Sequence, residues 1–421
     1  MNQHARRTSL FLCIGLLLPL TLLAGNGGSI YSRYGIGDLR YGYSAQSLGM
    51  AGTGLAILSS SNIDQTNPAS WSSINRTRWT VGALYEGYSS TDGASSAYLG
   101  GADFAGAMIA FPIAPRSGVV FAGGITPYSR VNYNAVTPAS QSGLDYSLRF
   151  IGSGGLSSAH AGISASLTDD LHAGIQLQYY FGTLRHTVQQ NFTGSQYSSA
   201  EVVRSTQLRG TGVTLGLIYS GLGGALHLAE TEHLSNGAYV SSSARLSSDQ
   251  DDFLKYVAGG LTTYDTSTVA TGSTHLPLAA GAGVSYANDR VTIGADMQYQ
   301  NWNAYTDRGV HPAELRDSYR YSAGIDLAPL RDATAAFTRR MAFRTGLYYD
   351  KTYYVLNSQP VNEFGVSAGT GIPIFGETRL HIGAEYALRG TTDFGLQKDK
   401  IIRFSFTVSG GELWFVRPVE E

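Results

Sequence analysis

Cysteine, charge and long apolar runs are scarce in this chain. Its single cysteine, Cys13, lies in the apolar segment near the N-terminus. Charged residues make up 14% of the sequence, well below the usual quarter or so, and the formal net charge is −2. Beyond residue 24 no run approaches the roughly eighteen apolar residues that a transmembrane helix needs. The balance of charge excludes a basic surface for nucleic acid.

Metal-binding and catalytic patterns are missing as well. The nine histidines are scattered, with no H-x-x-x-H pair and no H-E-x-x-H. No phosphate-binding loop ends in Lys-Ser or Lys-Thr. We therefore expect no enzymatic activity, no catalytic residue, no metal and no cofactor.

The first 24 residues have the pattern of a secretory signal peptide. Arg6 and Arg7 precede the apolar stretch LFLCIGLLLPLTLLA, and Ala24 or Gly25 offers a small residue for cleavage. A retained membrane anchor is the alternative, although the stretch is short for a spanning helix. Removal of residues 1–24 leaves a chain without cysteine, which excludes disulfides, thiol catalysis and cysteine-bound metals.

Period-two alternation dominates the remainder of the chain. In VTIGADMQYQ (291–300) apolar residues such as Ile293 and Met297 share one face, whereas Asp296 and Gln298 share the other. Such alternation is typical of a strand with one apolar face and one polar or small face. Fourteen segments are predicted: 76–90, 100–113, 117–130, 145–167, 171–186, 202–219, 223–234, 274–287, 290–303, 317–328, 339–352, 361–374, 378–390 and 401–409.

The links between these segments indicate a barrel. Tight turns (LTDD, SGLG, ANDR, IFGET) alternate with longer polar loops at 187–201, 235–273, 304–316 and 391–400. An even strand number with one short-turned rim predicts an all-β fold, a fourteen-stranded antiparallel transmembrane β-barrel over residues 76–409. Residues 410–421 would form a periplasmic tail. A secreted β-sandwich or adhesin is the alternative, but it would show no such difference between rims.

Residues 25–75 precede the first strand and are predicted to form a plug inside the barrel. The inward faces carry Gly, Ser, Thr and Ala more than charge, which leaves space for a packed segment. Alternatively, the inward glycines only relieve crowding in a twisted sheet. The turn Asn67-Pro68-Ala69 would be stiff, because Pro68 fixes its own backbone and biases Asn67 towards extended geometry.

Residues 47–71, SLGMAGTGLAILSSSNIDQTNPASW, resemble the N-terminal hatch of FadL-type outer-membrane transporters. The resemblance rests on Leu48-Gly49, Gly52, Gly54 and Asn67-Pro68-Ala69 in order and spacing, and YSRYGIGDL (31–39) resembles openings of a Bacteroidota-type branch. It implies passive transport of hydrophobic molecules, such as long-chain fatty acids or aromatic compounds. The implied location is the outer membrane of a Gram-negative-type bacterium.

A ligand site is expected where the predicted loop 235–273 contains SSDQDDFLKYVAGGL. Ser248 as N-cap and Gly259-Gly260 as stop predict a short amphipathic helix. Because FadL-type proteins have an apolar groove between such loops, the expected ligand-binding residues are Phe253, Leu254, Val257 and Leu261, with Leu48 and Met50 of the plug. The alternative is a helix that merely packs onto the barrel rim.

The third predicted strand contains Gly123, Gly124 and Pro127, which disfavour regular pairing. The resemblance implies a kinked third strand that opens a side exit from lumen to bilayer. Residues 150–156, FIGSGGL, are a competing kink, and ordinary barrel curvature would explain both.

Three functions remain open. The first is passive transport with lateral exit; the second is an interaction role in type IX secretion, where the barrel binds a translocon; the third is lipid hydrolysis with a serine and one of His160, His172 or His381. Expected partners are hydrophobic small molecules or lipids, the outer membrane, and the outer-membrane assembly machinery during biogenesis.

Overall fold

The computed structural model describes residues 28–141, 143–192, 199–229, 232–258, 261–330, 332 and 334–412. The predicted signal peptide, 1–24, lies outside the described residues, as do residues 413–421 of the predicted tail. None of the helices in the described part is long and apolar enough to cross a membrane.

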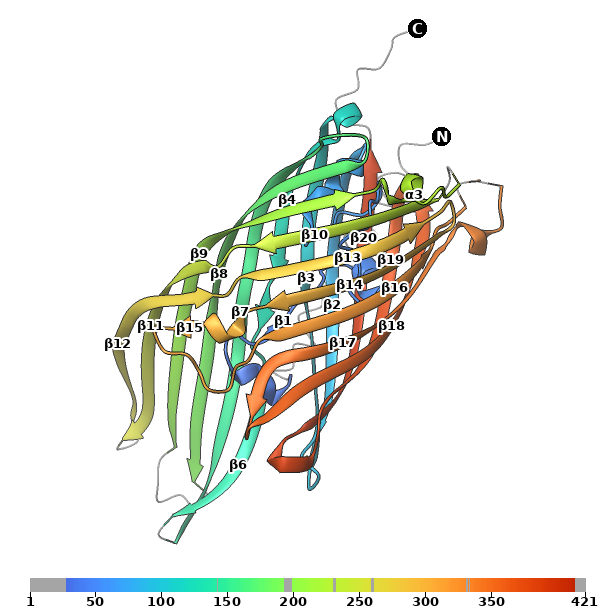
Figure 1. The fold of residues 1–421 in the computed structure, drawn as a ribbon. Helices are drawn as coiled ribbons and strands as arrows, with labels where there is room; N and C mark the ends of the chain where they lie inside the picture. Colours follow the sequence, from blue (N-terminus) through green and yellow to red (C-terminus); the bar gives the residue numbers. More distant parts are fainter. Residues whose placement is uncertain are drawn as a thin grey trace, which may run out of the picture.

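The described chain forms a closed antiparallel β-barrel of fourteen wall strands (Figure 1). Four of these strands are interrupted: the third is β4 plus β6, the seventh β10 plus β11, the eighth β12 plus β13, and the ninth β14 plus β15. Pairing of β20 with β2 closes the barrel. The bounds are β2 (Thr77–Thr91), β3 (Ser96–Ala114), β4 (Val119–Pro127), β6 (Tyr133–Gln141), β7 (Leu144–Ser166), β8 (Leu171–Phe192), β9 (Ala200–Tyr219), β10 (His233–Ser241), β11 (Ala244–Ala258), β12 (Leu261–Leu276), β13 (Ala279–Ala287), β14 (Val291–Gln300), β15 (Thr306–Asp307), β16 (Ser318–Leu327), β17 (Ala342–Leu356), β18 (Gln359–Phe375), β19 (Thr378–Gly390) and β20 (Lys398–Glu412).

The outward face of the wall is apolar, as a lipid-facing surface requires. On β14, Ile293 is 45% exposed and Met297 42% exposed, whereas Asp296 and Gln298 of the same strand are buried inside. The predicted facing of this strand is therefore confirmed. Closure of the barrel gives the backbone hydrogen-bonding groups of most wall strands partners on both sides, which a bilayer demands.

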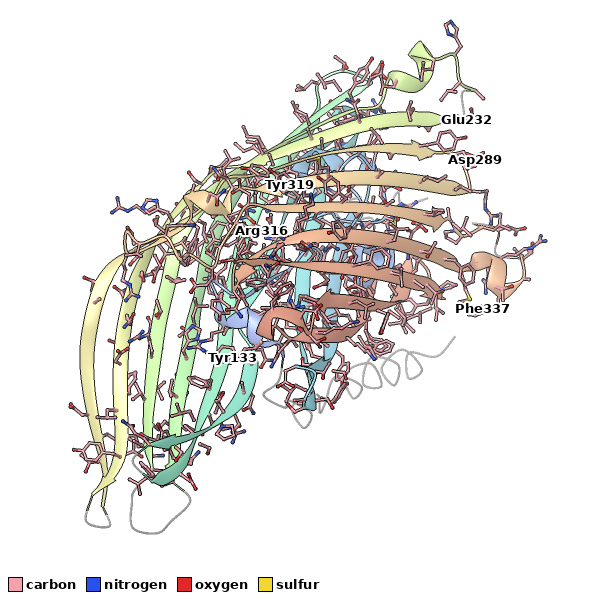
Figure 2. The ribbon with its side chains drawn as sticks, turned by 60° about the horizontal axis from the view of Figure 1, so that its bottom comes forward. Tyr133, Glu232, Asp289, Arg316, Tyr319 and Phe337 are labelled. Carbon is pink, nitrogen blue, oxygen red and sulfur yellow. The ribbon has the colours of Figure 1, made fainter. Side chains whose placement is uncertain are left out.

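The two rims of the barrel differ, though in another way than predicted. At the terminal rim, the end where β2 begins and β20 stops, two links are long: 220–232 and 328–341. Figure 2 shows Glu232 and Phe337 of these links at that rim, near Asp289. At the opposite end, the tall rim, the hairpins β6–β7, β8–β9 and β11–β12 extend furthest (Figure 1), and the predicted loops at 304–316 and 391–400 lie largely between strands.

Two predicted boundaries are wrong. The seventh strand, expected at 223–234, is the pair β10 and β11, and the short helix α3 (Leu222–Ala225) lies where that strand was expected. In the tall hairpin β11–β12 neither face needs apolar residues, so the period-two signal disappears there. Strand β20 runs to Glu412, so the tail begins later than residue 410.

Residues 28–76, the plug, lie inside the barrel, drawn blue in Figure 1. They contain η2 (Ile30–Arg33), β1 (Asp38–Leu39), α2 (Ala45–Gly49) and η3 (Pro68–Ser73). The plug bonds to strands on several sides of the wall: Ala45 N to Thr407 Oγ1 (2.8 Å), Thr53 Oγ1 to Ser322 Oγ (3.0 Å), Gly54 N to Asp296 Oδ2 (2.6 Å), and Asn67 Nδ2 to Leu217 O (3.3 Å). Its first residues lie towards the tall rim and η3 towards the terminal rim, because Ser29 bonds Asp399 and Ser72 bonds His172.

Candidate functional site

The third wall strand is broken between β4 and β6. Pro127 is the last residue of β4, and the next residues bend inwards to form β5 (Ser129–Arg130). Strand β5 pairs with β1 of the plug rather than with the wall. Gly123 and Gly124 are regularly paired with β3 and β7, so the break begins after Pro127 and not at the glycines.

Contacts with the plug hold the inward bend in place. The Arg40 amide donates to Tyr128 O (3.0 Å), Ser129 Oγ donates to Ile36 O (2.7 Å), and the Asn132 amide donates to Ser32 Oγ (3.0 Å). These bonds satisfy backbone groups that the wall ladder leaves unpaired.

The neighbouring strand makes room for the bend at a glycine. Gly155 of β7 has φ 148, and a β-carbon there would lie 2.2 Å from Ser129 O. Only glycine permits both this backbone conformation and this close approach. The predicted competing kink at 150–156 is thus next to the break, while β7 itself pairs with β8 without a register shift from Tyr146 to Ser166.

The break leaves a gap in the wall between β3 and β6. Strand β3 pairs with β4 only from Ala107 towards the terminal rim, and among the described residues no pairing joins Ser96–Gly106 to β6. Phe104 and Ile125 beside the gap are each 48% exposed on the outward face. The gap therefore opens at a level of the barrel where the outer surface is apolar.

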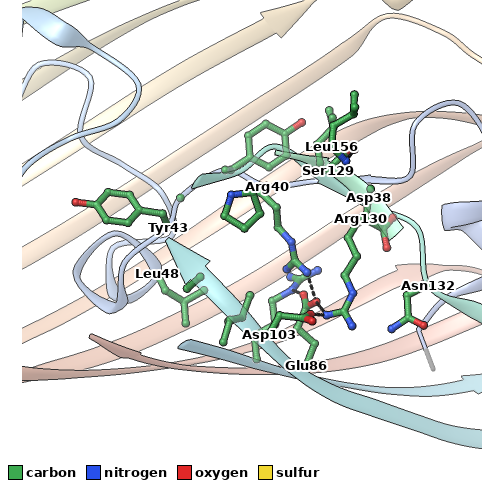
Figure 3. A pocket seen from close by; sticks show the side chains of 18 of the residues that line it. Asp38, Arg40, Tyr43, Leu48, Glu86, Asp103, Ser129, Arg130, Asn132 and Leu156 are labelled. Atoms are coloured by element: carbon green, nitrogen blue, oxygen red, sulfur yellow. Dashed lines mark hydrogen bonds and ion pairs between the residues drawn. The ribbon is translucent and has the colours of Figure 1, made fainter. Parts of the chain in front are cut away.

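Behind the gap lies a cavity of about 700 Å³ between plug and wall (Figure 3). Apolar side chains of Leu48, Leu84, Phe104 and Leu156 line part of it. Eleven charged residues also line it: Asp38, Arg40, Glu86, Asp103, Arg130, Arg320, Asp350, Glu363, Glu385, Arg389 and Arg403. The lining is thus amphipathic, with charges of both signs nearly in balance.

Ion pairs connect the plug, the break and the wall across this cavity. Glu86 of β2 pairs with Arg40 of the plug, with Arg130 of the break (3.7 Å) and with Arg403 of β20 (2.9 Å). Arg130 also pairs with Asp103 of β3 and so bridges the gap, where Figure 3 shows both arginines converging on the carboxylates.

A second group of ion pairs lies deeper in the wall. Arg403 pairs with Glu385 and with Glu363 (3.0 Å). Arg389 pairs with Asp38 of the plug (2.8 Å) and Asp399 (3.1 Å). Sequence spacing could not reveal these clusters, because they unite strands from both ends of the chain.

The predicted amphipathic helix is absent, and this prediction is wrong. Phe253, Leu254 and Val257 lie in β11, and Leu261 is the first residue of β12. As neighbours in a strand, Phe253 and Leu254 point to opposite faces, and they are 38% and 37% exposed. Pairing of β11 with β9 and β12 replaces the helix that the capping residues predicted, and Phe253 and Leu254 therefore share no face.

The two plug residues expected to bind ligand differ in position. Leu48 lines the large cavity. Met50 packs its backbone on the wall: a β-carbon at Gly324 would lie 2.8 Å from Met50 O, and one at Gly346 would lie 2.5 Å from its carbonyl carbon. Met50 therefore fixes the plug in the barrel and does not face the cavity.

The hatch turn Asn67-Pro68-Ala69 begins η3. Asn67 Oδ1 accepts from the Ala69 amide (3.1 Å), while its Nδ2 donates to Leu55 O (2.7 Å) and to Leu217 O (3.3 Å). The turn lies directly on the wall, since a β-carbon at Gly216 would be 2.0 Å from Asn67 Oδ1. One side chain thus caps a helix and joins plug to barrel.

One catalytic pattern, missed in the sequence, is Gly-x-Ser-x-Gly at Gly365–Gly369. The nucleophile elbow that this pattern marks is a sharp strand-to-helix turn. Ser367 instead lies in the middle of β18, and its Oγ donates to Gly346 O at 3.5 Å. Within the described ranges, no three His, Cys, Asp or Glu side chains lie close enough together to hold a metal.

A family model named BamG matches residues 7–418 of this chain. No protein in a search of curated proteins matches it.

Several solved structures have the same fold. The toluene transporter TodX of P. putida has a TM-score of 0.57 at 17% identity, over 89% of this chain and 99% of TodX. The toluene transporter TbuX of Ralstonia pickettii has a TM-score of 0.57 at 14% identity, over 88% and 98%. A FadL homologue of Pseudomonas aeruginosa has a TM-score of 0.57 at 15% identity, over 87% and 98%. At such identities the likeness establishes the FadL-type fold.

Proposed function

This chain belongs to the BamG family, and we propose on that premise that it is an outer-membrane barrel through which hydrophobic molecules pass without energy input. The observation that carries the proposal is the gap between β3 and β6, which leads from the cavity to an apolar part of the outer surface. TodX and TbuX, which share the fold, are described as toluene transporters. The substrates we propose are aromatic compounds or long-chain fatty acids.

The proposed route leaves sideways through the gap. An apolar molecule in the cavity contacts Leu48, Phe104 and Leu156, and beyond the gap it meets lipid. Direct passage through water to the periplasm is unfavourable, because each methylene group transferred to water costs about 0.8 kcal/mol. We orient the barrel with its terminal rim towards the periplasm, which is where the first strand begins and the last strand ends in bacterial barrels.

The charged part of the cavity restricts the route. Arg130 and Asp103 stand across the gap, so their pair must separate or shift for a molecule to leave. We place the moving parts in β5 and in the plug residues that pair with it, and we assign no catalytic step and no cofactor to the protein.

A cleavable cross-link across the gap tests the route. Since the chain without residues 1–24 has no cysteine, Asp103→Cys with Arg130→Cys gives one reactive pair, which a bismaleimide with a reducible disulfide in its linker can join. A matched control joins Ala323→Cys to Leu347→Cys, an outward pair between β16 and β17. Uptake of labelled long-chain fatty acid and of toluene is measured in cells that lack the unmodified protein.

We expect the cross-link across the gap to reduce uptake at least tenfold and reduction of the linker to restore it. The control cross-link should leave uptake unchanged. Equal uptake with the gap open and closed would contradict the lateral route. No uptake even by the unmodified protein would contradict transport itself.

A second candidate is an interaction role at the outer membrane, favoured by the family name, which points to the β-barrel assembly machinery. The type IX secretion role is another form of this candidate, with a translocon as partner. Purification from gently solubilised membranes tests both: reproducible recovery with the assembly machinery or a translocon, together with absent uptake, would favour partnership over transport.

A further inference from the structure

A second, smaller cavity lies beside the plug and borders the large cavity at Arg40. Its volume is about 110 Å³, enough for several water molecules. We call it the polar chamber. It shares Leu39, Arg40, Tyr41 and Pro127 with the large cavity, and its remaining lining comes from the plug, from β4 and from the wall strands β7 to β14.

Three buried side chains that line the polar chamber each have a polar atom without a hydrogen-bond partner. Ser158 Oγ, His160 Nε2 and Gln176 Oε1 have no hydrogen-bond partner among the described residues. The three residues are only 4%, 6% and 1% exposed. Polar atoms buried so deeply are nearly always bonded in folded proteins, so these three point to an occupant that offers donors and acceptors.

The other walls of the chamber are uncharged and held in fixed positions. Gln178 Oε1 accepts from Tyr180 Oη (2.7 Å), Gln298 Oε1 accepts from Tyr239 Oη (3.2 Å), and Gln300 Nε2 donates to Tyr128 Oη (2.8 Å). Tyr128 and Tyr180 meet edge to face, with ring centroids 5.1 Å apart. The chamber thus combines amide and hydroxyl groups with aromatic rings.

The charge of the chamber limits what it can hold. Its one charged side chain, Arg40, already pairs with Glu86, so a charged ligand would find no free counter-charge. A purely apolar ligand would leave Ser158, His160 and Gln176 unsatisfied. A molecule with hydroxyl groups on a compact carbon frame matches both the polar atoms and the aromatic rings.

We propose that the polar chamber binds a small uncharged polyhydroxy compound. Such a ligand would contact the wall at Ser158, His160 and Gln176 and the plug at Tyr41 and Gln65, and would therefore link the two parts of the protein. The chamber borders the large cavity at the four shared residues, but Ser158, His160 and Gln176 line the chamber alone.

Binding of glycerol and erythritol to the detergent-purified protein, measured by saturation-transfer NMR titration, tests the proposal. We expect saturable binding of at least one of the two compounds. Gln176→Leu, which keeps the size of the side chain, should weaken binding at least tenfold. Gln207→Leu, on the exposed face of β9, should leave it unchanged. Ser158→Ala removes a single hydroxyl and provides a second variant that should assemble normally and weaken binding about threefold.

Two results would overturn the proposal: no saturable binding by the unmodified protein, or equal affinity in the unmodified protein, Gln176→Leu and Ser158→Ala. A density map recorded with erythritol that shows only water in the chamber would also overturn it. Uptake of fatty acid by Gln176→Leu should equal that of the unmodified protein. Failure of polyol binding and failure of hydrophobic transport can thus be told apart.

Discussion

The two ends of the plug are held to the barrel by different kinds of contact. Near the tall rim, residues 28–44 are held by charge and by the inward bend: Asp38 pairs with Arg389, and Arg40 pairs with Glu86. Towards the terminal rim, residues 45–74 are held by hydrogen bonds and by close packing, because the plug backbone rests on wall glycines. Gly324 and Gly346 receive Met50, and Gly174 and Gly216 receive the hatch turn.

This difference separates an anchor from a part that can move. The plug backbone packs so closely against these wall glycines that a β-carbon on any of them would clash with it. Ion pairs can exchange partners, and Glu86 is shared by three arginines. We infer that residues 45–74 stay fixed and that residues 28–44 move when a molecule passes the gap.

The largest loss of unfolding free energy is expected when a side chain replaces one of the wall glycines against which residues 45–74 pack. A β-carbon at Gly346 would lie 2.5 Å from the carbonyl carbon of Met50, so Gly346→Val forces the plug away and should cost about 3 kcal/mol of unfolding free energy. This loss is measured as a decrease in the temperature at which the band of the folded protein disappears in gel electrophoresis. The matched control, Ala295→Val on the outward face of β14, should have little effect. An unchanged transition for Gly346→Val would mean that shape does not hold the plug.

A somewhat smaller effect is expected from the hatch turn. Asn67→Ala removes a helix cap and leaves the buried Leu55 carbonyl without its partner, which should cost about 2 kcal/mol. Thermal unfolding measures the loss, with Asn191→Ala on the exposed end of β8 as control. Equal melting of the two variants would contradict the anchoring role of Asn67.

Loss of a charged contact in residues 28–44 should lower the unfolding free energy less, and its effect should stay within these residues. Arg40→Met leaves Glu86 paired with Arg403 and Arg130, so the expected loss is only about 1–2 kcal/mol. Hydrogen exchange should become faster in residues 28–44 and stay unchanged in residues 45–74. Faster exchange along the entire plug would show that both ends move together and would remove the distinction drawn above.

The smallest effect concerns the pair across the gap. Asp103 is about one-third exposed, so its coupling to Arg130 in a double-mutant cycle should be about 0.5–1 kcal/mol. The cycle uses Asp103→Asn and Arg130→Met, and the coupling should fall when salt is raised. A coupling that is large and independent of salt would identify a permanent closure rather than a gate.

The regular wall could be predicted because lipid imposes a pattern on it. Ile293 and Met297 face outwards and Asp296 and Gln298 inwards, as the alternation indicated. The tall hairpin β11–β12 could not be predicted in this way, since β11 does not alternate between apolar and polar residues and its sequence SSDQDDFL also satisfies the rules for a helix start.

The break in the third strand was only partly predictable. Pro127 marks its beginning, because a proline cannot donate to the ladder. The bend itself depends on plug residues about ninety positions earlier in the chain, such as Ile36 and Arg40. The clusters of ion pairs depend on the register between β2 and β20, which exists only once the barrel has closed.

The seam between β20 and β2 has a consequence for the order of assembly. Several partners of the plug come from the last strands to be synthesised: Ala45 bonds Thr407, Ser29 bonds Asp399, and Asp38 pairs with Arg389. These three contacts can form only after the last strands have been synthesised. A chain truncated before β19 would lose all three, although the plug would keep its bonds to β5, β9, β14 and β16. Complete attachment of the plug to the wall therefore requires β19 and β20.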